Sequence, residues 1–413
     1  MPLTSLSLFI RPLIILSLRF QLPISSSLPL NNSTISRQTP EIPKTPSMEI
    51  QQSLLVLSGK SPIENELARS FRDSKNLKAS DGEEITISLQ SEIPGSSNQA
   101  FRIESYMDAL STDRFGKFLI WSPRLASTHD IVSQNFCELP IGSVCVADVQ
   151  FKGRGRSKNL WESPIGCLLF SFTLQMENGR VVPLLQYVVS LAVTEAINMV
   201  CEAKGLPHLD VKIKWPNDLY LDGLKVGGIL CTSTYRSKKF NVSAGIGLNV
   251  DNDKPTTCLN SKLHQLGSAH QLRKEDILAA FFNKFEVLFY AFMDQGFEAL
   301  EDLYYKTWLH SGQKVVIEEK SEGQSVETTT VTIQGLTSSG YLLAIGEDNK
   351  PYELHPDGNS FDFFKGLCSS ESLTHQVGIL FDHGVLFDHG VLSVIISFPL
   401  AGSDQFAWYG LAR

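Results

Sequence analysis

Residues Gln150–Pro164 read Q-F-K-G-R-G-R-S-K-N-L-W-E-S-P and join two strand-like apolar runs, Val144–Val149 and Cys167–Leu174. The segment is therefore expected to be a loop between two strands, not a phosphate loop that precedes a helix. Its glycines would let the backbone approach a ligand closely, and its arginines suit phosphate or carboxylate groups. The stretch predicts a clamp for a small anionic ligand, and the alternative is a solvated basic turn.

A second informative stretch, Lys212–Leu230, reads K-I-K-W-P-N-D-L-Y-L-D-G-L-K-V-G-G-I-L. Its pattern predicts a short strand over Val211–Trp215 and a later hairpin that turns at Asp222-Gly223. Lys214 alternates with apolar neighbours on the first strand. Burying an unpaired ammonium is costly, so such a lysine is expected to have an anionic partner, although it can also extend to water.

Together these stretches resemble the signature of the biotin protein ligases, whose eukaryotic members are called holocarboxylase synthetases. The matching motifs are G-R-G-R with W-x-S-P-x-G, and K-W-P-N-D with K-x-G-G-I-L. The S-T-H-D run at 127–130 is similar to the family's element upstream of the glycine loop, and Gly245–Val250 is similar to its G-x-G-x-N strand. The four motifs stand in the family's order, which makes them far more specific than a single glycine loop.

The fold class that the resemblance implies is α+β. A mixed β-sheet with packed helices, like the catalytic domain of class II synthetases, would precede a small SH3-like β-barrel. Apolar spacing predicts helices from Pro183 onward, from Lys274 to Phe292 and from Phe297 to Leu309, and short strands between 312 and 365. The expected segments are a presequence at 1–47, an extension and linker at 48–100, a catalytic domain at 101–310, the barrel at 311–367 and an atypical tail at 368–413.

The resemblance also implies which residues bind the ligands. Ser127 is in addition a good N-cap by its own chemistry, and a helix N-terminus can hold polar ligand atoms, although an ordinary cap is the alternative. The residues implied for biotin and its adenylate are Ser127, Thr128, His129, Gln150, Arg154, Gly155, Arg156 and Lys214, with Lys214, Arg154 and Arg156 as the catalytic ones. Weaker candidates, for phosphate or magnesium contacts, are Asn217, Asp218, Lys225 and Gly228.

The implied reaction uses biotin, ATP and Mg²⁺. Biotin would be joined to AMP with release of pyrophosphate, and then transferred to a lysine on the biotin carboxyl carrier domain of an acetyl-CoA carboxylase-type enzyme. The two arginines and magnesium would stabilise charge on the phosphates, and Lys214 would hold the biotin carboxylate and the α-phosphate in line. No protein nucleophile and no protein-bound metal are expected.

Two other functions remain open at this point. A lipoate or octanoate ligase or transferase would share the fold, but those families lack the combination of G-R-G-R with K-W-P-N-D. A biotin-binding regulatory protein with impaired turnover would follow if the unusual tail disables the small domain. The motifs at 153–156 and 214–218 are intact, which favours the enzyme.

Composition narrows the class of protein further. The chain has 413 residues and a net charge of −8, which argues against an electrostatic nucleic-acid surface. Its seven cysteines form no C-x-x-C pair, so neither a zinc site nor a disulfide framework is expected. The apolar run Leu13–Leu16 is too short to span a membrane. Oligomeric state cannot be inferred from these features.

Residues 1–47 resemble an organellar transit peptide, because they carry four cations and one acid among many serines and prolines. Chloroplast or mitochondrion, or both, are the expected destinations. A product that starts at Met48 would lack this segment and would be cytosolic.

The tail from Cys368 to Arg413 departs from the family pattern. It contains F-D-H-G-V-L twice in tandem, which places His383 and His389 six residues apart. A metal site there would need a fold that brings these side chains together. Val391–Leu400 is apolar and prone to aggregate if exposed, so a read-through intron or an alternative transcript end is the preferred explanation. Residues 48–100 contain two strand-like runs and no basic recognition helix.

Overall fold

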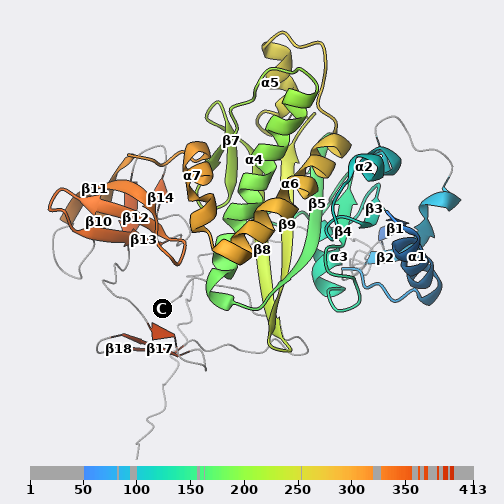
Figure 1. Ribbon diagram of the computed structural model, residues 1–413, viewed down its shortest axis with the longest axis horizontal. Helices are drawn as coiled ribbons and strands as arrows, with labels where there is room; N and C mark the ends of the chain where they lie inside the picture. Colours follow the sequence, from blue (N-terminus) through green and yellow to red (C-terminus); the bar gives the residue numbers. More distant parts are fainter. Residues whose placement is uncertain are drawn as a thin grey trace, which may run out of the picture. The chain divides into compact units, whose positions relative to one another are not determined.

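A computed structural model describes residues 51–80, 83–93, 100–155, 159–161, 163–252, 254–319 and 327–355, together with short strands farther on (Figure 1). The predicted presequence at 1–47, Arg156 and both histidines of the tandem repeat lie outside these residues.

The larger sheet has nine strands in the order β2-β1-β3-β4-β5-β9-β8-β7-β6. The pairs β1–β2 and β3–β4 are parallel and the other pairs are antiparallel, so the sheet is mixed, as predicted. Its strands are β1 (Gln51–Gly59), β2 (Glu83–Leu89), β3 (Phe118–Ser122), β4 (Val144–Ala147), β5 (Cys167–Met176), β6 (Lys212–Lys214), β7 (Asp218–Leu221), β8 (Leu224–Arg236) and β9 (Lys239–Asn249).

The helices confirm the predicted α+β class. The helix predicted from Pro183 begins at Leu185, because Pro183 lies in a preceding 3₁₀ turn, Gly179–Leu184. The stretch Gly179–Ala203 is long and apolar enough to cross a membrane by composition, but 78% of its apolar 18-residue window is buried inside the protein. The helices are α1 (Pro62–Ser74), α2 (Ile103–Ala109), α3 (Thr128–Gln134), α4 (Leu185–Ala203), α5 (Leu259–Gln265), α6 (Lys274–Gln295) and α7 (Glu298–Thr307), and a short 3₁₀ helix spans Gln90–Glu92.

Helix α1 was not predicted, although its sequence carries a start signal. Ser61 caps the helix in a reciprocal capping box with Glu64, and Pro62 occupies the first turn, where its missing N–H costs nothing. The helix connects β1 to β2 as a parallel crossover, so residues 51–89 add two strands to the larger sheet.

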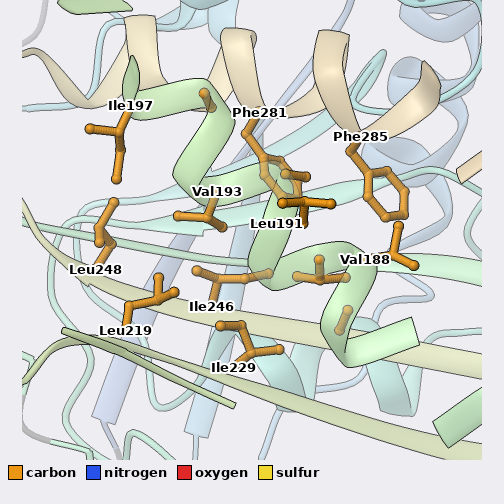
Figure 2. Close-up of a cluster of buried hydrophobic side chains, with 14 of the residues drawn as sticks. Val188, Leu191, Val193, Ile197, Leu219, Ile229, Ile246, Leu248, Phe281 and Phe285 are labelled. Atoms are coloured by element: carbon orange, nitrogen blue, oxygen red, sulfur yellow. The ribbon is translucent and has the colours of Figure 1, made fainter. Parts of the chain in front are cut away.

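Helix α4 lies between the larger sheet and α6 (Figure 1). Figure 2 shows Val188 and Leu191 of α4 among side chains of β7–β9 such as Ile246, with the rings of Phe281 and Phe285 of α6 beyond them. A second buried cluster lies on the opposite face of β1, β3 and β4 and includes side chains of α1 and α3. The sheet is therefore covered by helices on both faces.

The smaller sheet has six strands in the order β13-β12-β11-β10-β15-β14. Strand β15 lies across the predicted start of the tail at Cys368 and pairs in parallel with β10, so residues Cys368–Ser370 belong to this sheet. The short strands predicted between 312 and 365 include Phe361–Asp362, which is β14. The strands are β10 (Lys314–Glu319), β11 (Glu327–Leu336), β12 (Leu342–Gly346), β13 (Pro351–Leu354), β14 and β15 (Leu367–Ser370), and farther on β16 (Ile379–Leu380), β17 (Val385–Asp388) and β18 (Val391–Val394) form a third sheet.

Candidate active site

Strand β9 gives the larger sheet one apolar face and one face of small residues. Its residues Ala244, Ile246 and Leu248 lie in the core with α4. Side chains alternate along a strand, so Gly245 and Gly247 lie on the opposite face. Helix α3 packs against β5 and β9 on that face. The G-x-G-x-N motif therefore produces a strip of backbone without side chains of its own beside the N-terminus of a helix.

Lys214 shares this face with the glycines. It pairs with Asp218 across β6 and β7, Asp218 pairs with Gly228 on β8, and Gly228 pairs with Gly247 on β9. Residues directly opposite each other on neighbouring strands lie on the same face of a sheet. One row of residues thus crosses β6, β7, β8 and β9. It consists of Lys214, Asp218, Gly228 and Gly247.

The indole of Trp161 covers the glycine end of this row. A Cβ atom at Gly247 would come within 2.6 Å of the ring, so only glycine leaves room for it. Trp161 lies in the glycine-arginine loop, which folds back on itself as a hairpin. In this hairpin the Trp161 N–H donates to the carbonyl of Gly153 at 3.0 Å. Its indole Nε1 is buried and has no hydrogen-bond acceptor among the described residues.

The N-terminus of α3 is tied to the start of the same loop. Ser127 is the N-cap, as predicted, and accepts a hydrogen bond from the N–H of Asp130. The N–H and hydroxyl of Thr128 donate to Oε1 of Gln150 at 2.7 and 3.0 Å. The Thr128 hydroxyl also lies 2.8 Å from the hydroxyl of Ser171 on β5. The predicted residues Ser127, Thr128 and Gln150 therefore lie together.

His129 lies beside the glycine strip. Its Nε2 is 2.9 Å from the hydroxyl of Thr232, and its Nδ1 is buried without a partner among the described residues. A Cβ atom at Gly245 would come within 3.1 Å of that Nδ1. Burial, together with the positive charge of Arg154, lowers the pKa of His129 to about 4, so the ring is neutral at physiological pH.

Arg154 projects from the loop toward α3. Its Nε lies 3.0 Å from a carboxylate oxygen of Asp130, and the arginine side chain is 60% exposed whereas that of Asp130 is 5% exposed. Burial raises the pKa of Asp130, while Arg154 and a hydrogen bond from Ser80 act in the opposite direction. The buried carboxylate of Asp130 thus holds the guanidinium of the exposed Arg154 side chain beside α3.

The remaining predicted residues lie on or beside the row, except for Gly155, which lies in the loop. Lys214 Nζ is 5.6 Å from the centre of the Tyr220 ring, and Lys225 forms an ion pair with Asp218 at 2.7 Å. Asn217 is buried and its side-chain amide donates to the carbonyl of Ile229. Gly155 donates its N–H to the carbonyl of Asn159 within the loop hairpin.

Several residues at this site were missed by sequence reasoning. Trp161 belongs to the W-x-S-P motif, from which no role was predicted for it, and Asp130 belongs to the S-T-H-D run, from which none was predicted either. Ser171 and Thr232 carry no local signal, because their place beside α3 depends on strand pairing. The alternation of glycine with apolar residues in Gly245–Val250 was the available sign that one face must stay open.

Sequence comparisons define the class of protein to which this fold and site belong. Residues 121–249 match the Biotin/lipoate A/B protein ligase family, and residues 310–366 match the Biotin protein ligase C terminal domain.

Comparison with individual proteins narrows the class to one family. The chain is 64% identical over 317 residues to Biotin–protein ligase 1, chloroplastic, of Arabidopsis thaliana, covering 76% of this chain and 86% of that protein. It is 63% identical over 325 residues to Biotin–protein ligase 2 of the same plant, covering 78% and 98%. The biotin protein ligase from Aquifex aeolicus in complex with biotin and ATP is 26% identical, covers 57% of this chain and 94% of that one, and superposes with a TM-score of 0.45. The chain belongs to the biotin protein ligase family and is an enzyme.

Proposed function

We propose that this enzyme joins biotin to a specific lysine of a biotin carboxyl carrier domain through a biotinyl-5′-AMP intermediate. As a member of its family it is an ATP-dependent ligase that attaches biotin to protein. The biotinyl-5′-AMP intermediate, the carrier-domain acceptor and the residues that carry out the reaction are the parts that we propose here. The lipoate-type alternative is disfavoured because both plant relatives are named for biotin.

The observation that carries the proposal is the cross-strand row from Lys214 to Gly247. Biotin combines a polar ureido group, an apolar chain and a carboxylate. The glycine end of the row supplies a strip of backbone without side chains of its own, the Trp161 ring that covers it, and the Nδ1 of His129, which has no partner among the described residues. The opposite end supplies the ammonium of Lys214 on the same face. The row therefore suits a ligand that is uncharged at one end and anionic at the other.

The residues divide the chemistry as follows. Ser127, Thr128 and Gln150, together with His129, would orient biotin at the N-terminus of α3. Lys214 would bring the biotin carboxylate and the α-phosphate of ATP together for in-line attack, which is mainly a positioning effect. The loop residues Arg154, Gly155 and Arg156 would bind the phosphates and then cover the adenylate, which excludes water from the anhydride.

Asn217, Asp218, Lys225 and Gly228 would lie beside the proposed phosphate position. Among the described residues no group of three or more His, Cys, Asp or Glu side chains could hold a metal ion. Mg²⁺ is commonly bound through substrate phosphates and one or two carboxylates. We therefore expect Mg²⁺ to enter with ATP, where it would offset the phosphate charge. Asp218 is the candidate carboxylate, and it would have to exchange its ion pair with Lys225 for the metal.

The acceptor would be a carrier domain of an acetyl-CoA carboxylase-type enzyme. One plant relative is named chloroplastic, and the transit-peptide composition of residues 1–47 fits delivery to the chloroplast. Delivery to the mitochondrion, and a cytosolic form that starts at Met48, belong to the same proposal. Immunoblots of fractionated cells that show one species in one compartment would count against the second form.

The deciding experiment is biotin-dependent exchange of pyrophosphate into ATP, followed by transfer of biotin to an apo carrier domain. Exchange and transfer together are the expected result. Exchange without transfer would support the biotin-binding regulatory alternative and place the defect in the second step. Exchange with lipoate in place of biotin would overturn the proposal.

A further inference from the structure

The outer edge of the Lys214 strand is held by the segment that leads into the smaller sheet. Strand β6 is the last strand in the order of the larger sheet. Beyond it, Trp308 forms a parallel bridge with Ile213, and the N–H of Leu309 donates to the carbonyl of Ile213 at 2.9 Å. The segment after α7 therefore continues the ladder on the side away from β7.

The next bond in this ladder is made by a side chain. The backbone N–H of Trp215 donates to Nε2 of His310 at 2.9 Å, where a neighbouring strand would normally supply a carbonyl. Because Nε2 accepts, the ring proton is on Nδ1, which lies 2.9 Å from Oε1 of Gln313. The peptide groups on both sides of Lys214 are thus fixed by residues 309 and 310.

The His310 ring is suited to this role only while it is neutral. It is completely buried, and burial lowers its pKa to about 4, with Gln313 acting against that shift and the charge of Lys214 adding to it. A protonated imidazole has a hydrogen on both nitrogens and cannot accept a bond from Trp215.

A second contact joins Trp215 to the smaller sheet itself. Its indole N–H lies 2.9 Å from the hydroxyl of Tyr187 and 3.2 Å from the carbonyl of Gly340, and the Tyr187 hydroxyl donates to the same carbonyl. Gly340 lies in the turn between β11 and β12. Trp215 is therefore held at its backbone from the connecting segment and at its ring from the smaller sheet.

We propose that His310 is a positioning residue for Lys214, and that it makes the placement of this lysine depend on how the C-terminal sheet is docked. The inference rests on the role proposed above for Lys214. Strand β6 has three residues and, among the described strands, a single neighbour, β7. A displacement of about 1 Å at a group that aligns reactants can cost roughly 100-fold in rate.

The first test replaces the imidazole acceptor. His310→Leu keeps the volume but leaves the Trp215 N–H unpaired, whereas the amide oxygen of His310→Gln can still accept it. We expect His310→Leu to lower the kcat of biotin-dependent pyrophosphate exchange by about 10- to 100-fold with less than about threefold change in the KM for biotin. His310→Gln should remain within about threefold of the unchanged protein in both constants.

A second test uses the tautomer and stays informative if His310→Leu folds poorly. In Gln313→Glu a carboxylate next to Nδ1–H raises the pKa of His310, against the nearby Lys214 charge, so that a second proton is bound at mildly acidic pH. Exchange by Gln313→Glu should then fall more steeply between pH 8 and pH 6 than exchange by the unchanged protein. The double variant His310→Gln/Gln313→Glu lacks the titrating ring and should lose this extra pH dependence.

The outcomes separate this inference from the function on which it rests. Exchange by His310→Leu at the unchanged rate, or parallel pH profiles for Gln313→Glu and the unchanged protein, would overturn the positioning role while leaving the ligase intact. Absence of biotin-dependent exchange in the unchanged protein would instead overturn the proposed function.

Discussion

The guanidinium of Arg154 and the carboxylate of Asp130 lie 3.0 Å apart, so the glycine-arginine loop is attached to the N-terminus of α3. Arg154 is the more exposed partner, and Asp130 is fixed in addition by Ser80. A phosphate that binds at this loop must either pair with Arg154 together with Asp130 or replace Asp130 as its partner. The ion pair with Asp130 therefore sets the position of the Arg154 side chain before the adenylate binds to it.

Arg154→Ala should weaken retention of biotinyl-5′-AMP more than it weakens binding of biotin. The arginine would contact the phosphate and not the uncharged end of biotin, and a charge-assisted hydrogen bond contributes about 1.5–3 kcal/mol, or roughly 10- to 100-fold. Calorimetry would measure biotin binding, and the rate at which adenylate is lost from the enzyme would measure retention.

Lys152→Ala is the matched control, because Lys152 is an exposed cation two residues earlier in the same loop. It should leave both quantities almost unchanged. Equal losses of biotin and adenylate in Arg154→Ala would contradict the assigned role.

Lys214→Ala should abolish adenylate formation, with a fall of at least about 100-fold in pyrophosphate exchange, because the carboxylate and phosphate would no longer be aligned. Lys212→Ala is the control on the same strand, since the Lys212 ammonium pairs with Asp210 at 2.9 Å. Near-normal exchange by Lys214→Ala would refute the role.

Gly247→Ala should weaken biotin binding by displacing Trp161, because the added Cβ would come within 2.6 Å of the indole. The same change made in a Trp161→Leu background should cost less, since the clashing ring is absent. A double-mutant cycle of biotin affinities measures this coupling, which for residues in contact is of order 0.5–3 kcal/mol. Additive losses would show that the ring does not pack on Gly247.

His129 should make the folded protein lose stability as the pH falls from 7 to 5. The folded-state pKa is about 4 and the ordinary histidine pKa is 6.5, so the unfolded chain binds more protons in this window and stability is lost as pH decreases. The contribution is about 2 kcal/mol over these two pH units, as an order of magnitude.

Chemical denaturation at pH 7 and pH 5 would test this expectation with His129→Gln, whose free energy of unfolding should fall less on acidification. His208→Gln is the control, because His208 is exposed. An unchanged pH dependence in His129→Gln would mean that the ring is not buried in its neutral form.

Local sequence was sufficient where the signal is short-ranged. The cap at Ser127 follows from a hydroxyl that accepts a backbone N–H at the start of a helix, and the hairpin at Asp222-Gly223 follows from turn chemistry. The capping box at Ser61 carried an equally local signal for α1 and was overlooked. The helix predicted from Pro183 starts two residues later, at Leu185, because Pro183 lies inside the 3₁₀ turn that precedes the regular helix.

By itself the sequence determined the α+β class, the family and the chemical character of the ligand, because glycines, arginines and lysines keep their chemistry wherever they are placed. Only the tertiary structure decided which of them meet. Strand pairing puts Lys214 and Gly247 in one row, although they are far apart in the chain. Packing places Trp161 on the glycines and His310 against the Trp215 N–H. Such contacts depend on register and on long-range closure of the sheet, and no local pattern encodes either.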